Sequence, residues 1–251
     1  MHLGLSASAF CSLPAEKVID LACQNGLTVL EWNDEHIPFD NIEEAARIQR
    51  LTEEKGLKTV SYASKFPVMD EKPEAFEAVL QIAQTLGTDT ICLRTELPDT
   101  EDKKEQEEAT KKLAESIAHL ADMAGKIGIK LCIFCLQDTI FDDYRRAVQL
   151  MELVGRPNVF LNWQPKLSTS LIFNIFELKM LKEHVHHVYI AYTDSDSRHS
   201  LLVEEKDEWQ QYIKVLKEKK ERALLFRACS AHSFREDCAL LRDWVLEICS
   251  D

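Results

Sequence analysis

The chain has 251 residues, of which 45% are hydrophobic and 29% charged, and its formal net charge is -13. This length fits one α/β barrel of roughly 250 residues, although length alone also allows two ordinary domains. The acidic balance argues against a nucleic-acid binder, whose phosphate contacts need a basic surface, and it suits a cytoplasmic protein. No apolar run approaches the ~20 residues of a membrane helix, and the first residues do not read as a signal peptide. We therefore expect no membrane partner and no nucleic-acid partner.

Short apolar segments alternate with amphipathic segments along the whole chain, which predicts strands and helices in turn. The expected strands cover residues 3–7, 28–32, 58–63, 90–94, 130–135, 159–163, 187–191 and 223–227. The expected helices cover residues 14–24, 42–55, 74–86, 103–127, 144–154, 168–182, 208–219 and 234–248. Five strands follow a glycine of the kind that closes a helix, namely Gly26, Gly56, Gly87, Gly128 and Gly155.

Strands separated by helices imply parallel pairing through right-handed crossovers. Eight such units close a barrel, so the sequence predicts an α/β fold with a single (β/α)8 TIM barrel over residues 1–251. A doubly wound open sheet is the alternative, but it needs a phosphate-binding glycine turn after an early strand, and the sequence has none. Residues 193–207 form the longest expected loop, either a solvated connection or a lid.

The eight cysteines are scattered through apolar segments, which favours reduced core thiols over disulfides. Cys132 and Cys135 match a CxxC pattern, but residues three apart in a strand point to opposite faces, so we expect no shared metal ion. His184, His186 and His187 resemble a ligand cluster on paper, yet they lie where the seventh strand begins, on the stability face of a barrel.

Several strand ends carry motifs that resemble one known family. Residues 31–38 read EWNDEHIP, similar to its EWxxDxHxP turn; residues 61–66 read SYASKF, similar to SYGSYY. Residues 163–165 read WQP, as in the family, and residues 233–237 read SFRED, similar to its last helix. The order of these motifs resembles the sugar phosphate isomerase/epimerase family, a group of xylose isomerase-like barrels within the endonuclease IV-like superfamily. The resemblance implies a divalent cation such as manganese, magnesium or zinc, bound by carboxylates and histidines.

The positions that correspond to those ligands are largely changed. The resemblance assigns them to Phe134 and Leu136 on the fifth strand, Gln164 on the sixth, Tyr189 and Tyr192 on the seventh, and Phe226 on the eighth. A slip of one residue on the eighth strand places Arg227 there instead, and its charge repels a cation. An apolar wall does not offset the dehydration of a divalent ion, so we expect a degenerate site with no metal cofactor.

The remaining polar and aromatic side chains at strand ends predict either a ligand pocket or a thicker barrel plug. We assign ligand binding to Trp32, Tyr62, Arg94, Trp163, Gln164, Lys166, Tyr189, Tyr192 and Arg227. Aromatic faces suit a sugar-like ring, and the cations suit a phosphate or carboxylate. Glu31 and His36 are the candidates for acid–base catalysis, with structural roles as the alternative.

Three functions follow from these features. The first is a degenerate isomerase/epimerase-like protein that binds a small sugar-like or anionic ligand, with homo-oligomerisation left open. The second is an active isomerase or epimerase with a rearranged or metal-free site that uses Glu31 and His36. The third, a DNA-repair endonuclease of the same superfamily, needs a metal cluster and a basic face that this chain does not offer.

Overall fold

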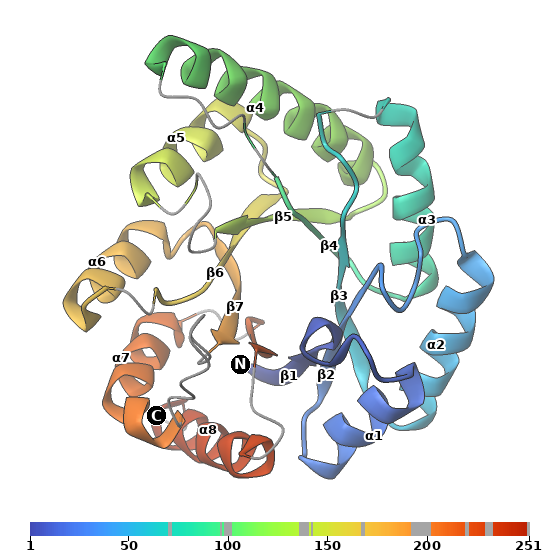
Figure 1. The fold of residues 1–251 in the computed structure, drawn as a ribbon, viewed down its shortest axis with the longest axis vertical. Helices are drawn as coiled ribbons and strands as arrows, with labels where there is room; N and C mark the ends of the chain where they lie inside the picture. Colours follow the sequence, from blue (N-terminus) through green and yellow to red (C-terminus); the bar gives the residue numbers. More distant parts are fainter. Residues whose placement is uncertain are drawn as a thin grey trace.

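Eight parallel strands form a closed barrel in chain order, and a helix follows each strand (Figure 1). The computed structural model describes residues 1–69, 72–95, 97, 102–135, 141, 143–166, 169–191, 202–218, 221–228 and 233–249. The expected (β/α)8 TIM barrel is therefore confirmed.

The strands are β1 (His2–Ser6), β2 (Val29–Asn33), β3 (Lys58–Ser64), β4 (Thr90–Leu93), β5 (Lys130–Cys135), β6 (Val159–Trp163), β7 (Val185–Ala191) and β8 (Ala223–Ala228). The helices are α1 (Ala15–Gln24), α2 (Ile42–Glu54), α3 (Phe76–Thr85), α4 (Lys103–Gly125), α5 (Tyr144–Val154), α6 (Leu171–Leu181), α7 (Lys206–Leu216) and α8 (Phe234–Cys249). Short 3-10 helices cover Ala7–Phe10, Pro73–Ala75 and Leu202–Glu205. All expected strands and helices are present, and most boundaries agree within two or three residues.

Local signals in the sequence set where the helices begin and end. Side chains of Asn41, Asp102, Asp143 and Ser170 accept hydrogen bonds from the first free backbone N–H groups of α2, α4, α5 and α6. The five expected glycines all have positive φ, as a helix-closing residue requires. The expected loop at 193–207 is shorter than predicted, because Leu202–Glu205 is helical and α7 begins at Lys206. Residues 193–201 lie outside the described part of the chain.

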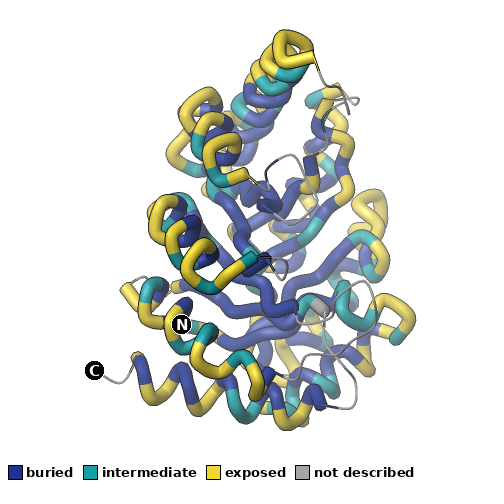
Figure 2. Tube along the Cα trace, turned by 60° about the vertical axis from the view of Figure 1, so that its left-hand side comes forward, coloured by how far each residue is buried: buried dark blue, intermediate teal, exposed yellow. Residues whose placement is uncertain are grey.

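The barrel separates two apolar layers. The larger one lies between the strands and the helices, and a smaller one fills the barrel interior around Val29, Cys132, Phe134, Tyr189 and Leu225. Figure 2 shows the strands as the most buried part of the molecule, with exposed residues on the outer sides of the helices. None of the helices in the described segments is long and apolar enough to cross a membrane.

Three register shifts among the described strands affect which residues face inward. They lie between β2 and β3 after Leu30, between β6 and β7 after Leu161, and between β7 and β8 after Ile190. On β8 the partners of Ile190 and Ala191 are Phe226 and Ala228, so Arg227 is the residue that the shift skips. A bulge of this kind changes the direction of side chains without ending the pairing.

Gly4 on β1 allows the close approach of neighbouring strands. A Cβ atom there would lie 2.5 Å from Val29 Cγ2 and from the Val29 carbonyl oxygen, and 2.8 Å from Leu225 Cδ2. We predict that Gly4→Ala lowers the free energy of unfolding by about 2 kcal/mol, because overpacking a tight interior forces strands apart.

Urea unfolding measures this loss, and Gly56→Ala is the matched control. Gly56 has φ of 73° and open space around its Cα, so the control carries only the left-handed backbone cost of about 1 kcal/mol. Equal losses in both variants would contradict the predicted steric contact.

Candidate functional site

The side chains at the C-terminal end of the barrel interior come from all parts of the sheet, since the C-terminal ends of parallel strands meet on one face. Phe134 of β5 stacks on Tyr189 of β7, with ring centroids 5.5 Å apart. The guanidinium carbon of Arg227, from β8, lies 5.2 Å from each of these two ring centroids. Three strands thus place a cation on an aromatic pair, an arrangement that is electrostatically favourable.

Glu31 of β2 is the buried carboxylate of this interior, with only 1% of its surface exposed. The Ser6 hydroxyl donates to its Oε1 at 2.7 Å, and the Ser61 hydroxyl donates to its Oε2 at 2.8 Å. The Tyr189 hydroxyl donates to the same Oε2 at 2.8 Å, and the Cys92 thiol does so at 3.4 Å. Neutral donors from four other strands therefore solvate this charge in place of water.

Asn162 of β6 completes the polar layer. Its Nδ2 donates to the Tyr189 hydroxyl and to Cys92 Sγ, both at 3.0 Å, and its Oδ1 accepts from the backbone N–H of His187 at 3.3 Å. The sequence reading chose Gln164 for the sixth strand and missed this residue. A polar side chain in the middle of the apolar segment at residues 159–163 was the available signal. Gln164 is half-buried, and its Oε1 has no hydrogen-bond partner among the residues that the structure describes.

The donor set at the ends of β5 to β8 does not fit a divalent cation. Asn162 offers an amide, Tyr189 a phenol and Arg227 a guanidinium, while the ring of Phe134 has no atom that can bind a metal ion. Hard divalent ions need several oxygen or imidazole ligands converging on one point. Among the described residues, no three histidine, cysteine, aspartate or glutamate side chains are grouped to hold a metal ion. Leu136, another expected position, lies outside the described residues.

The prediction that Phe226 takes a metal-ligand position in the mouth is wrong. Phe226 is fully buried in the layer outside the barrel, where its ring packs at 5.3 Å, edge to face, against Phe234 of α8. The inward residue is its neighbour Arg227. Phe134 and Tyr189 do face the interior, as expected.

Three residues predicted to bind ligand lie in the outer layer instead. Trp32, Tyr62 and Trp163 are fully buried between strands and helices. The Tyr62 hydroxyl donates to the Asp34 carboxylate and to the Ile37 carbonyl, and burial raises the pKa of Asp34. These aromatic side chains pack between the strands and the helices, and Tyr62 also holds the loop after β2. The prediction that the three residues bind ligand in the mouth is therefore wrong.

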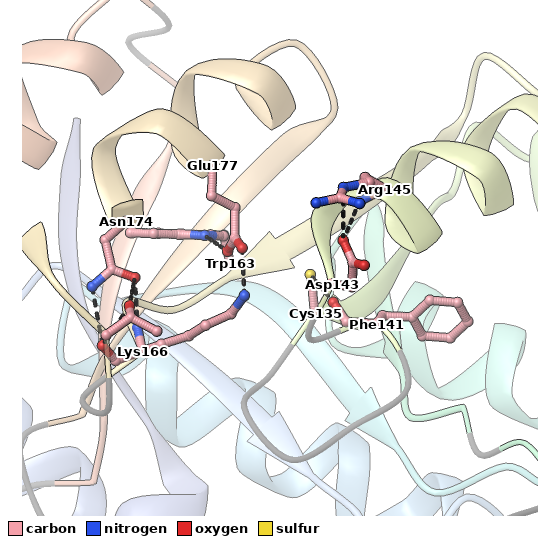
Figure 3. A network of polar contacts seen from close by, with 9 residues as sticks. Cys135, Phe141, Asp143, Arg145, Trp163, Lys166, Asn174 and Glu177 are labelled. Atoms are coloured by element: carbon pink, nitrogen blue, oxygen red, sulfur yellow. Dashed lines mark hydrogen bonds and ion pairs between the residues drawn. The ribbon is translucent and has the colours of Figure 1, made fainter. Parts of the chain in front are cut away.

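Lys166 is likewise unavailable as a surface cation in the mouth. Its ammonium forms a buried ion pair with Glu177 of α6, whose other oxygen accepts from Trp163 Nε1 at 3.0 Å (Figure 3). Asn174 of α6 also accepts from the Lys166 backbone N–H at 3.0 Å. This network fixes the loop after β6 to α6, a structural role that the sequence reading did not include.

His36 is a loop residue whose ring nitrogens are both engaged. Nδ1 lies 2.8 Å from Asn33 Oδ1, and Nε2 lies 3.1 Å from the Leu13 carbonyl. Burial lowers the pKa of His36, while the Leu13 carbonyl and Glu35 favour its charged form. The geometry suits a histidine that holds the loop after β2.

Arg94 lies at the rim, just after β4. Together with Lys65, Thr95 and the apolar side chains that follow β3, it lines a pocket of ≈ 370 Å³. Thr95 is buried, and its hydroxyl has no hydrogen-bond partner in the described part of the chain. Two cationic side chains thus share this cavity wall, and the ammonium of Lys65 forms an ion pair with Glu35. Tyr192 lies outside the described residues.

Tyr189→Phe tests the polar layer without disturbing the stacked rings. Removing the hydroxyl takes one donor from Glu31 and one acceptor from Asn162. We predict a loss of about 2 kcal/mol in the free energy of unfolding, since hydrogen bonds to charged groups contribute roughly 1.5–3 kcal/mol.

Chemical denaturation checks this, with Tyr144→Phe as the control. Tyr144 is a half-buried residue of α5, outside the barrel. A Tyr189→Phe protein as stable as the control would mean that the hydroxyl does not solvate Glu31.

Comparisons with known proteins agree with this architecture. Residues 19–244 match the family model described as xylose isomerase-like TIM barrel. No curated protein matches the chain in sequence.

Solved structures share the fold over nearly the full length. D-psicose 3-epimerase with D-tagatose from Clostridium cellulolyticum H10 is 11% identical, with a TM-score of 0.75 over 99% of each chain. AP endonuclease, family 2, from Brucella melitensis is 16% identical, with a TM-score of 0.72 over 96% of this chain and 98% of that one. The IOLI protein with a binding zinc atom is 15% identical, with a TM-score of 0.71 over 100% and 98%. At these identities the likeness establishes the fold alone. The match to the family model over most of the sequence shows that the chain belongs to the xylose isomerase-like TIM barrel family.

Proposed function

We propose that this chain is a metal-free member of the sugar isomerase/epimerase-like barrels that binds a small anionic, sugar-like ligand at the C-terminal mouth. The observation that carries the proposal is the position of Arg227 over Phe134 and Tyr189. A guanidinium at the centre of the mouth repels a divalent cation and attracts a carboxylate or a phosphate.

The surroundings of Arg227 support ligand binding. Its guanidinium lies over the two stacked rings, and a guanidinium carries paired N–H donors that match the two oxygens of a carboxylate or phosphate. Gln164, directly after β6, adds a neutral polar group of the type that hydrogen-bonds sugar hydroxyls. The rim pocket adds Arg94 on the same face of the barrel, beside Lys65, whose ammonium is paired with Glu35.

An active isomerase that uses Glu31 and His36 has less support from the geometry. The Glu31 oxygens already accept from four protein donors, and both His36 nitrogens have partners. A catalytic base needs an oxygen or nitrogen that reaches the substrate proton. We also place the protein in the cytoplasm, because the described cysteines are all free thiols, as a reducing compartment favours.

The first test is metal-dependent stability. After chelator treatment, addition of manganese or cobalt at sub-millimolar concentration is expected to leave the melting temperature unchanged. A native site occupied at 100 times its Kd would add about 2.7 kcal/mol of stability.

The double variant Phe134→Glu/Arg227→Glu is the comparison. It places carboxylates at the ends of β5 and β8 and is expected to gain stability from manganese. Clear stabilisation of the wild-type protein by manganese or cobalt would overturn the metal-free proposal.

The second test is anion binding. We expect calorimetric titration with a panel of sugar phosphates and sugar acids to find at least one ligand that Arg227→Gln binds at least tenfold more weakly. The expectation follows because a charge-assisted hydrogen bond contributes roughly 1.5–3 kcal/mol.

Arg50→Gln, on the exposed side of α2, is the matched control and should bind as the wild type does. If neutral sugars bind and the Arg227 variant keeps full affinity, the anionic ligand class is wrong.

A further inference from the structure

A second cavity lies at the opposite end of the barrel, where the strands begin. Its volume is ≈ 430 Å³, and its polar lining includes His2, Lys58, Lys130, His186, His187 and Glu221. We call it the basal cavity. It contains two of the three histidines that the sequence placed at the start of the seventh strand, and no part of the proposed mouth site uses it.

His187 presents an unsatisfied donor to this cavity. The residue is 1% exposed, and its Nδ1 accepts a hydrogen bond from the backbone N–H of Ala223 at 3.3 Å. A neutral imidazole that accepts at Nδ1 carries its proton at Nε2. That Nε2 is buried and makes no hydrogen bond of normal length and angle with the described residues, although the Val60 carbonyl acts on the ring. Leaving a buried N–H without a well-aligned acceptor costs free energy, so this position favours an acceptor supplied from outside the chain.

The charged side chains that act on His187 are cations. Burial and the nearby charges of His186, Lys130 and His2 hold the pKa of His187 well below its usual range, while the Val60 carbonyl favours the charged form. Burial, the amino terminus and Lys58 lower the pKa of His2, and Glu221 raises it. The charged groups that act on His187 are cationic, and Glu221 is the acidic group that acts on His2.

The acidic groups near the cavity are partly occupied. Asp89 accepts from Lys130 Nζ at 2.5 Å and from the Thr90 hydroxyl at 2.8 Å. Thr90 Oγ1 also lies 3.3 Å from His186 Nε2. Of the two lysines that line the cavity, Lys130 is engaged with Asp89, so the exposed Lys58 is the one that remains to meet a ligand there.

We propose that the basal cavity binds a small oxyanion, a phosphate or a carboxylate, through the Nε2–H of His187 and the ammonium of Lys58. A ligand that accepts from both donors at once satisfies the buried N–H and neutralises the local charge. The N-terminal face of such barrels is ordinarily a stabilising layer, so a ligand here would act apart from the mouth. The inference does not depend on the proposed function.

The test is a titration of the full-length protein with inorganic phosphate, and separately with malonate, at constant ionic strength. Binding is followed by the melting temperature and by the imidazole ¹H–¹⁵N signals of His187. We expect a saturable shift of the Nε2–H signal, and an apparent Kd about tenfold weaker in Lys58→Gln, as loss of one charge-assisted hydrogen bond implies.

Two control variants separate the possible sites. Lys112→Gln removes a charge from the exposed side of α4, and Arg227→Gln removes the cation of the mouth, so both should keep the wild-type response of His187. Saturation by only one of the two anions would assign the ligand class and support the proposal. No saturable change at His187, or an affinity unaffected by Lys58→Gln but lost in Arg227→Gln, would overturn it.

Discussion

The solvation of one buried carboxylate by neutral donors shapes the interior of this barrel. Glu31 on β2 draws hydroxyl and thiol hydrogens from β1, β3, β4 and β7, and Asn162 on β6 ties Tyr189 and Cys92 into the same layer. An unsolvated charge at this depth costs several kcal/mol. The donors that prevent this cost also join six of the eight strands, so the same hydrogen bonds that keep Glu31 inside fix the position of the Tyr189 ring.

That ring connects the polar layer to the mouth. Tyr189 stacks on Phe134, and the pair supports Arg227. The chain keeps the family's fold, but an arginine and two aromatic rings lie toward the ends of β5, β7 and β8. The positive charge of this arginine repels cations and attracts anions at the C-terminal end of the barrel. At the other end of the barrel, His187 on the same strand β7 lines the basal cavity, and its Nε2 has no well-aligned acceptor among the described residues. The two ends of one barrel thus present different cationic environments.

The order of strands and helices could be predicted because each unit carries its own local signals, including the helix-closing glycines. The site was harder to predict, for reasons visible in particular residues. Successive residues of a strand point to opposite faces, so the sequence already implies that Glu31 and Trp32 cannot both face the mouth, and the prediction for Trp32 was wrong. Phe226 and Arg227 were different, because strands buried on both faces have no alternating pattern and the register shift beside Ile190 appears only in three dimensions. Lys166 was misplaced because its partner Glu177 comes from α6, a contact that the sequence does not reveal.

The most direct measurement of the central claim is anomalous diffraction from crystals of the native protein grown with manganese. The account predicts no anomalous peak within about 2.6 Å of a protein oxygen or nitrogen at the C-terminal ends of the strands, a range that spans ordinary ligand distances for hard divalent ions. It also predicts that the Arg227 guanidinium lies over Phe134 and Tyr189 in the electron density. A manganese ion coordinated by Glu31, Asn162 or Tyr189, with Arg227 turned away, would contradict it.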